Sequence, residues 1–471
     1  MYRGLRLVLL RVIHFKLPYS RKGSIMKKSI RIVSAAAVGL LTVSPLAACG
    51  ASNTAGSAST DKPIELNVWA WDSYMPQTVD DFEKANPNIK VKVTNVGSST
   101  EEYMSLNNAI AAGSGLPDAV QIEYYALPQF VIHDDLRDLS SFGADKYADF
   151  YTPGTWSSVN INGGVYALPV DSGPLALYYN EEVFQKAGIA EPPKTWDEYY
   201  EDAKKIRAVG SYIGADAGDA GQFESLVWQA GGTPFRTSED NTTVTINLTG
   251  DEGTQKVAQY WQKLIDEDLV NTKLKSFTDD WRKSLDNGDI AGLITGGWIK
   301  LQSSAPNAAG KWRVALIPQW NEGETGYSEV GGSSLAIPKG VADDRAEAVY
   351  KFVDYVTHNR KGIDTRVQGG AFPADKDTLA SDSFINQTAV ESDEGQEIDY
   401  YGGQKFHEPL AETANNVSRD FSYLPFEVYA REVFADTVGA AYTTNTSVAD
   451  GLVEWQKNLT EYAKNQGFTV K

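Results

Sequence analysis

The chain has 471 residues with 43 Lys and Arg against 62 Asp and Glu, a formal charge of −19. Residues 1–48 hold nine basic residues and no acidic one, so residues 49–471 carry 34 basic and 62 acidic side chains, a charge of −28. This acidity argues against nucleic acid as a partner, because phosphate binding requires clustered positive charge. Residues 49–471 are long enough for two domains and contain all 11 tryptophans.

Residues 26–48 have the order of a secretory signal peptide. Basic residues follow Met26, an apolar stretch occupies residues 32–43, and small residues end the segment. The alternative, a transmembrane helix, is less favoured because the interrupted apolar stretch is shorter than the roughly 20 residues that span a bilayer. We interpret residues 1–25, which are basic and contain no acid, as an extension upstream of the true start at Met26.

Cys49 is the only cysteine of the chain. With the three preceding residues it forms Leu-Ala-Ala-Cys, which resembles the lipobox of bacterial lipoproteins, in which the cysteine becomes the lipidated N-terminus. The alternatives are a bridge between molecules or a thiol in a discarded leader, since one cysteine cannot form an internal disulfide. Residues 50–63 lack aromatic and large aliphatic side chains and are expected to form a flexible tether. We therefore expect an extracytoplasmic protein, lipid-anchored to the bacterial cell membrane.

The first folded segment predicts a β-α-β unit. Residues 64–70 alternate apolar and polar side chains as a strand does, a helix follows that ends near Pro87, and residues 89–93 alternate again. This order implies parallel strands joined by a right-handed crossover. A second helix and a strand over residues 119–122 continue the pattern.

Several candidate binding residues lie where these strands end, because ligands of α/β sheets bind beyond the carboxyl ends of strands. Trp71 and Asp72 follow the first strand, and Glu123 and Tyr124 follow the third. Ser99 is a further candidate, although capping of the second helix is the stronger interpretation for Ser99 or its neighbour Thr100.

Farther along, a Gly-Gly turn, two strands and two helices are predicted between residues 163 and 209. Thr195 is expected to cap the second of these helices, with Glu198 in the capping-box position. The ordered pieces GVYALP, LYYN, VFQKAGI and PPKTWDE in this part of the chain strongly resemble the family 1 extracellular solute-binding proteins. These are the sugar-capturing lipoproteins of bacterial ABC importers.

Other segments agree with this family in the same order. They are FEKANPNIKVKV, AIAAGSGLPDAVQIE, NGDIAGLITGGWIKL, EVGGSSLAIPKGVADDRAEAVYKFVDYV and GGAFPADKDTL. The resemblance implies an α/β, two-lobe periplasmic-binding-protein-like fold of type II with the ligand cleft between the lobes. We expect lobe 1 to comprise residues 64–171 and about 330–371, and lobe 2 about 172–329 and 372–471.

The resemblance also implies the function. We expect a monomeric, non-enzymatic subunit without a cofactor that binds a carbohydrate, closes, and delivers it to the membrane permease subunits of an ABC importer. In either transport or sugar sensing, closure around the ligand would be recognised by a membrane partner, so the sequence leaves a sugar-sensing receptor subunit open.

Sugar binding requires a flat aromatic face and fixed hydrogen-bonding groups. Trp298 follows two glycines, and the family places a ligand-side tryptophan at the corresponding position. The remaining candidates, from loops and strand ends, are Asp171, Gln222, Trp228, Trp320, Gly332 and Phe372. None of the candidates is basic, which favours an uncharged sugar, and several aromatic residues would suit an oligosaccharide.

An extracellular glycoside-active enzyme is the alternative from another class, because two carboxylates flanking one bond suffice for that chemistry. The histidines after residue 48, His133, His358 and His407, form no His-x-x-x-His pair, and Gly-x-Ser-x-Gly does not occur. These absences exclude several hydrolase classes but not glycosidases.

Overall fold

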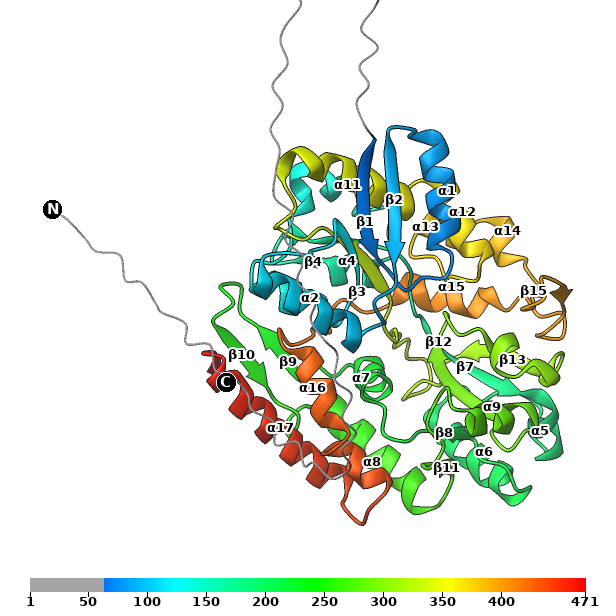
Figure 1. The fold of residues 1–471 in the computed structure, drawn as a ribbon. Coiled ribbons are helices and arrows are strands. Elements are labelled where there is room, and N and C mark those ends of the chain that lie inside the picture. Colours follow the sequence, from blue (N-terminus) through cyan, green and yellow to red (C-terminus); the bar gives the residue numbers. More distant parts are fainter. Residues whose placement is uncertain (1–62) are drawn as a thin grey trace, which may run out of the picture. The chain divides into compact units, whose positions relative to one another are not determined.

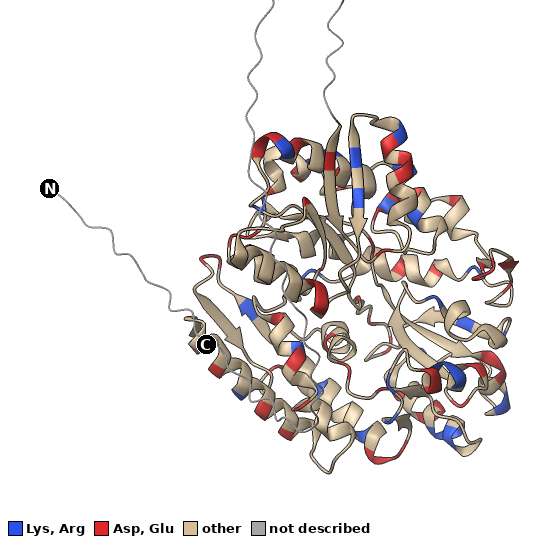
Figure 2. Ribbon diagram, in the orientation of Figure 1, with Lys and Arg blue, Asp and Glu red and all other residues tan. Residues whose placement is uncertain are grey.

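The computed structural model describes residues 63–471. The predicted signal peptide, Cys49 and residues 50–62 of the tether lie outside this part. Within residues 63–471, no helix is both long and apolar enough to cross a membrane. In the view of Figure 2, Lys and Arg are scattered among Asp and Glu rather than gathered over one element.

The first lobe is built around a five-stranded sheet with the order β2-β1-β3-β14-β6 (Figure 1). Its strands are β2 (Ile89–Thr94), β1 (Ile64–Trp69), β3 (Ala119–Glu123), β14 (Ser333–Ala336) and β6 (Ala167–Pro169). β1 is parallel to β2 and β3, which confirms the predicted β-α-β unit. β14 is antiparallel to β3, so its first residue, Ser333, pairs with Glu123 at the carboxyl end of β3.

Helices that pack on this sheet bury its apolar faces. They are α1 (Met75–Ala85), α2 (Thr100–Ala112), α3 (Leu127–Ile132), α4 (Pro153–Val159), α11 (Asp343–Thr357) and α12 (Arg360–Gln368). α1 ends at Ala85, two residues before Pro87, because a proline disfavours the helical conformation of the residue directly before it. Phe82 of α1 meets Phe352 of α11 edge to face, with 5.1 Å between ring centroids, in the core of this lobe.

The second lobe contains an antiparallel sheet with the order β12-β7-β13. Its strands are β12 (Gly292–Gly296), β7 (Leu175–Asn180) and β13 (Trp312–Leu316). α5 (Glu181–Lys186) and α6 (Trp196–Ala208) follow β7. Thr195 and Glu198 form the predicted capping box at the start of α6, so this prediction is confirmed.

The rest of the second lobe is mostly helical. Its longer helices are α7 (Ala220–Gln229), α8 (Glu252–Asp266), α9 (Asp279–Asp286), α15 (His407–Asn416), α16 (Glu427–Phe434) and α17 (Val448–Asn465). A small sheet joins β9 (Phe235–Thr237), β10 (Thr243–Ile246) and β17 (Thr469–Val470). Trp455 of α17 is fully buried and packs against Phe434 at 5.0 Å, which fastens α17 to α16.

Two antiparallel segments, residues 171–175 and 328–333, connect the lobes, and we call them the hinge segments. Val330 N donates to Gly173 O at 2.7 Å, and Leu175 N donates to Ser328 O at 3.0 Å. A third segment crosses beside them, because Ser172 N donates to Phe372 O at 3.1 Å. Through these segments the chain leaves the sheet of one lobe and enters the sheet of the other, so the two lobes meet beside them. The predicted lobe boundaries remain predictions.

A cavity between the lobes as the candidate ligand site

A cavity of about 400 Å³ lies where the two lobes meet. This volume is within the range of small-molecule sites. Its walls come from the carboxyl ends of β1, β3 and β12, from both hinge segments, and from α7, α9, α16 and the loop before α9. The lining residues are Trp71, Glu123, Asp171, Ala215, Asp219, Gly221, Gln222, Ser276, Phe277, Trp281, Leu293, Ile294, Thr295, Trp298, Ile299, Val330, Gly331, Gly332, Ser333 and Arg431.

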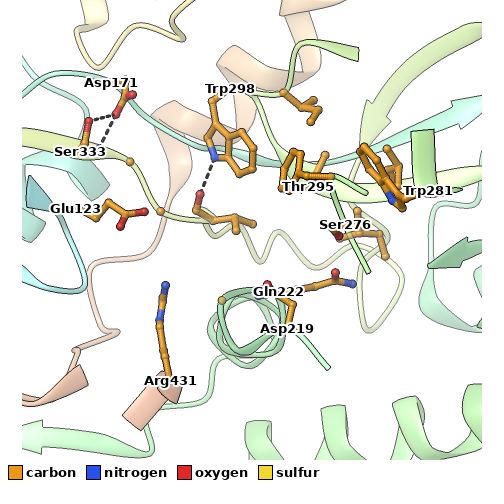
Figure 3. Close-up of a pocket in the computed structure, with 18 of the residues that line it drawn as sticks. Glu123, Asp171, Asp219, Gln222, Ser276, Trp281, Thr295, Trp298, Ser333 and Arg431 are labelled. Atoms are coloured by element: carbon orange, nitrogen blue, oxygen red, sulfur yellow. Dashed lines mark hydrogen bonds between the residues drawn. The ribbon is translucent and has the colours of Figure 1, made fainter. Parts of the chain in front are cut away.

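Aromatic side chains form one wall of the cavity (Figure 3). Trp298 is held by its indole N–H, which donates to Val330 O at 2.8 Å. Its edge also lies against Gly296, where an added Cβ would come within 2.4 Å of Nε1. Gly296 therefore gives the indole room, whereas Gly297 makes room for Phe372 and Pro174 instead. The hydrogen bond of the indole leaves its ring face to the cavity.

Phe277 extends this aromatic wall from the loop before α9. Its ring is 52% exposed and lies 5.3 Å from Trp281 and 6.3 Å from Trp298. Its backbone has φ +66°, a conformation that is unfavourable for a bulky residue. Phe277 therefore presents an exposed aromatic ring at the rim of the cavity.

Carboxylates from the first lobe form the opposite wall. Glu123 Oε2 accepts hydrogen bonds from Ser99 Oγ at 2.6 Å and from Tyr103 OH at 3.0 Å. Asp171 Oδ1 accepts from both Ser333 N at 2.5 Å and Ser333 Oγ at 2.9 Å. These contacts fix both carboxylates in position without using all of their acceptor capacity.

The pKa of Asp171 is raised to about 6, because burial disfavours its charged form. The positive charge of Arg366 and the two bonds from Ser333 oppose this shift. Asp171 is therefore charged at neutral pH and can accept hydrogen bonds from a ligand, but it becomes neutral in mildly acidic solution.

The first turn of α7 forms the floor of the cavity in Figure 3. Asp219 caps this helix by accepting a hydrogen bond from Gln222 N at 2.8 Å. Arg431 points toward this turn from α16, and its guanidinium is bound by Glu224, with Nε at 3.0 Å and Nη2 at 2.7 Å from Oε2.

Half of the candidate residues from the sequence line this cavity. They are Trp71, Glu123, Asp171, Gln222, Trp298 and Gly332. Their contact with a ligand remains a prediction. The strand-end argument located the first two, because β1 and β3 are parallel neighbours whose carboxyl ends reach the same edge.

Three other candidates support the cavity from behind. Asp72 accepts a hydrogen bond from Tyr74 N at 2.8 Å and lies 3.5 Å from the buried Arg366. The buried Tyr124 donates from its hydroxyl to Asp171 O at 2.7 Å. Ser99 donates to Glu123, so the interpretation that its side chain caps α2 is wrong.

The last three candidates are packing residues away from the cavity. Trp228 stacks on Phe421 with 5.1 Å between centroids. Trp320 packs on Trp196 at 5.3 Å. Phe372 is buried in the core of the second lobe, directly behind Gly297. Trp228 and Trp320 thus each pack on an aromatic neighbour distant in the sequence, and Phe372 packs on Phe384 at 5.6 Å.

Several lining residues were not among the sequence candidates. They are Asp219, Ser276, Phe277, Trp281, Thr295, Ser333 and Arg431. Asp219 and Ser333 could have been found, since each adjoins a segment that already held a candidate. Arg431 gave no local signal, because its place depends on a partner 207 residues away.

The fold and the cavity define a class, the two-lobe α/β binding proteins with a ligand site between the lobes. The family model for bacterial extracellular solute-binding proteins matches residues 70–362, and the chain belongs to this family. Its fold is the type II fold of periplasmic sugar-binding proteins, which confirms the predicted fold class.

The chain is similar to an ABC transporter-associated binding protein of B. animalis subsp. lactis Bl-04, solved in complex with β-1,6-galactobiose. Identity is 51% and the TM-score 0.78, over 87% of this chain and 100% of that one. A galacto-N-biose/lacto-N-biose I-binding protein of Bifidobacterium longum, solved with lacto-N-biose, is 26% identical with a TM-score of 0.72, over 87% and 99%. The lactose-binding protein of Rhizobium radiobacter is 28% identical over 59% of this chain and 67% of its own length.

Proposed function

We propose that the protein captures an uncharged, galactose-containing disaccharide or short oligosaccharide between its lobes and delivers it, chemically unaltered, to the permease of an ABC importer. The observation that carries this proposal is the composition of the cavity. An aromatic wall on the second lobe faces carboxylates held by the first lobe. A pyranose presents apolar C–H groups to one side and hydroxyls around its edge, and this pair of walls matches both.

The position of the cavity supports capture by closure. Trp298 comes from the second lobe, Glu123 from the first, and Asp171 from a hinge segment. A sugar that contacts all three has more contacts when the lobes are together, so its binding favours the closed state by that difference in affinity. A permease that recognises the closed state would then distinguish loaded from empty protein.

The relatives support the sugar class. The protein that is 51% identical was solved with β-1,6-galactobiose, and other relatives are named for lactose or lacto-N-biose. These sugars are uncharged galactosides, which agrees with the cavity described above.

Calorimetric titration of residues 62–471 with β-1,6-galactobiose, lactose, lacto-N-biose and maltose tests the proposal. We expect saturable binding of at least one galactoside and recovery of the intact sugar by chromatography after prolonged incubation. Release of monosaccharide would assign the protein to the glycoside-active enzymes. Lack of binding to any of these sugars would contradict the proposed ligand class.

We also propose that Cys49 carries a lipid that anchors the protein to the cell membrane. The support is the signal-like segment before it and the absence of any other cysteine in the sequence. Metabolic labelling with radioactive palmitate should mark the wild-type protein in the membrane fraction, and Cys49→Ser should abolish the label. Equal labelling of both proteins would refute lipidation at Cys49.

A further inference from the structure

Arg431 is the one arginine among the residues that line the cavity. Both hydrogen bonds that its guanidinium makes end on the same atom, Glu224 Oε2. No group within residues 63–471 accepts a hydrogen bond from Nη1. This nitrogen lies beside the first turn of α7, 3.4 Å from the position of a Cβ added at Gly221. Two of the five N–H groups of Arg431 are therefore used by Glu224, and the two on Nη1 remain available at the cavity.

Arg431 also connects the two lobes. The centre of its guanidinium lies 3.8 Å from the ring centroid of Tyr125, which follows β3 of the first lobe, and 5.7 Å from that of Tyr423. A guanidinium over an aromatic face is attracted by the ring quadrupole. The side chain is thus held on one side by Glu224 of the second lobe and on the other by Tyr125 of the first.

A second buried carboxyl group lies behind this arrangement. Glu224 and Glu427 are 3% and 0% exposed. Glu427 Oε2 accepts a hydrogen bond from Leu424 N at 2.8 Å, whereas Oε1 of Glu224 and Oε1 of Glu427 have no partner within residues 63–471. Two buried carboxylates with unpartnered oxygens would repel each other, so a charge on both is unfavourable.

The surroundings of Glu427 favour its neutral form. Burial raises the pKa of Glu427 well above its usual value, and the charge of Glu224 raises it further. Arg431 opposes this shift. The other titratable groups facing this cluster are the hydroxyls of Tyr423 and Tyr125, whose pKa values burial also raises, so both stay neutral.

We propose that Arg431 recognises the ligand by donating from Nη1 to an uncharged oxygen of the sugar, and that the buried Glu224 and Glu427 form the positioning pair that holds it. The inference rests on the sugar-binding function proposed above and deepens it. Because Glu224 compensates the charge of Arg431, and because Glu123, Asp171 and Asp219 also line the cavity, the site favours neutral sugars over acidic ones.

The test is a calorimetric titration with β-1,6-galactobiose between pH 6 and pH 9, using wild type and Arg431→Met. We expect Arg431→Met to bind about 10- to 100-fold more weakly, as for the loss of a hydrogen bond to a charged group. Arg419→Met is the matched control, because Arg419 is exposed and does not line the cavity. Digalacturonic acid, offered to the wild type, should bind more weakly than the neutral disaccharide.

Glu427→Gln and Glu427→Leu test the positioning pair. The amide of glutamine can donate to Glu224 and accept from Leu424 N, so Glu427→Gln should bind within about threefold of wild type. Its affinity should also be independent of pH between pH 7 and pH 9, because the amide does not titrate. A leucine side chain can neither donate to Glu224 nor accept from Leu424 N, so Glu427→Leu should bind the sugar about tenfold more weakly than wild type.

The outcomes separate the two proposals. If wild type binds none of the offered sugars, the proposed function fails and this inference fails with it. If wild type binds and Arg431→Met binds within twofold of it, only this inference fails. If Arg431→Met unfolds, the two Glu427 variants decide. Sugar affinity that is retained in Glu427→Gln and lost in Glu427→Leu supports the inference. Equal sugar affinities of the two variants, or tighter binding of digalacturonic acid than of the neutral disaccharide by wild type, overturn it.

Discussion

The indole N–H of Trp298 donates to the carbonyl oxygen of Val330 at 2.8 Å, which joins the aromatic wall of the cavity to a hinge segment. Trp298 belongs to the second lobe, and Val330 lies beside Gly173, where the chain passes between the lobes. The orientation of the ring and the path of the hinge therefore depend on each other. A ligand that stacks on Trp298 would contact a side chain that is already coupled to the segment about which the lobes move.

This coupling gives a prediction for Trp298. Phenylalanine keeps an aromatic face but loses the bond to Val330, so Trp298→Phe should weaken sugar binding about tenfold and lower the free energy of unfolding by about 1 kcal/mol. Trp298→Ala should remove most of the affinity and cost about 3 kcal/mol, because the ring also packs into the core of the second lobe. Titration and urea denaturation measure the two effects.

The control for Trp298 is Trp320→Phe, since Trp320 packs on Trp196 and lies outside the cavity. This variant should lose some stability and no affinity. Unchanged sugar binding in Trp298→Ala would show that the indole does not contact the ligand.

Asp171 predicts a pH dependence of binding. Its pKa in the folded protein is about 6, raised by burial, so its carboxylate is charged above that pH and neutral below it. We expect sugar affinity to fall as the pH decreases from 7 to 5, because a protonated Asp171 loses part of its capacity to accept hydrogen bonds. Asp171→Asn should bind more weakly at pH 7 and show no such decrease.

The same group affects stability with the opposite sign. The folded-state pKa of Asp171 is above the usual aspartate value of 3.8, so its contribution to stability is full below about pH 4. This contribution is lost as the pH rises to about 6. Unfolding measured from pH 4 to pH 7 should show the decrease in wild type and not in Asp171→Asn; a parallel decrease in both would assign it to another group.

The sequence predicted the parts of the site that local patterns determine. Alternating side chains located β1, and β3 was predicted as the strand that follows the second helix. The rule for strand ends then located Trp71 and Glu123. The two glycines before Trp298 indicated a ring with room to reach a ligand, and the structure shows that Gly296 provides this room.

The sequence could not separate cavity aromatics from core aromatics in loops. The neighbours of Trp228 and Trp320 in the sequence are like those expected around a binding residue. Only the folded chain shows that Trp228 packs on Phe421 and Trp320 on Trp196, away from the cavity. Arg431 was missed for the same reason, because its partners Glu224 and Tyr125 come from distant segments.

We predict that replacing Glu102 increases the free energy of unfolding. Its side chain is 0% exposed, and neither carboxyl oxygen has a partner within residues 63–471. Burial, and secondarily the charge of Glu123, raises its pKa to about 8. Stability from a group with a raised pKa is lost as the pH rises from the unfolded value of about 4.5 through 8.

Glu102→Met should therefore raise the free energy of unfolding at pH 9 by about 2 kcal/mol, and by less at pH 5. Glu101→Gln is the control, because Glu101 lies on the same helix but is exposed. Urea denaturation at both pH values measures the difference. A loss of stability in Glu102→Met at pH 9 would mean that the carboxylate is satisfied in solution.

We predict that the hydrogen bond between Asn162 and Asn241 contributes to lobe closure. Asn162 lies in the turn between β4 (Asn160–Ile161) and β5 (Gly164–Val165) of the first lobe, and Asn241 in the β9–β10 turn of the second. Asn162 Nδ2 donates to Asn241 Oδ1 at 3.0 Å, so the bond links the lobes away from the cavity. Both residues have positive φ, 51° and 57°, which asparagine tolerates better than most residues.

Asn241→Gly keeps the turn conformation and removes only the acceptor, whereas Asn241→Asp keeps an oxygen for Asn162. We expect the glycine variant to be more open without ligand, with a larger radius of gyration by small-angle scattering, and to bind sugar about two- to fivefold more weakly, as for one exposed hydrogen bond. The aspartate variant should behave like wild type in both measurements. If both variants match wild type, the bond between the turns makes no contribution to closure, and the hinge segments with their contacts to Trp298 set the lobe equilibrium.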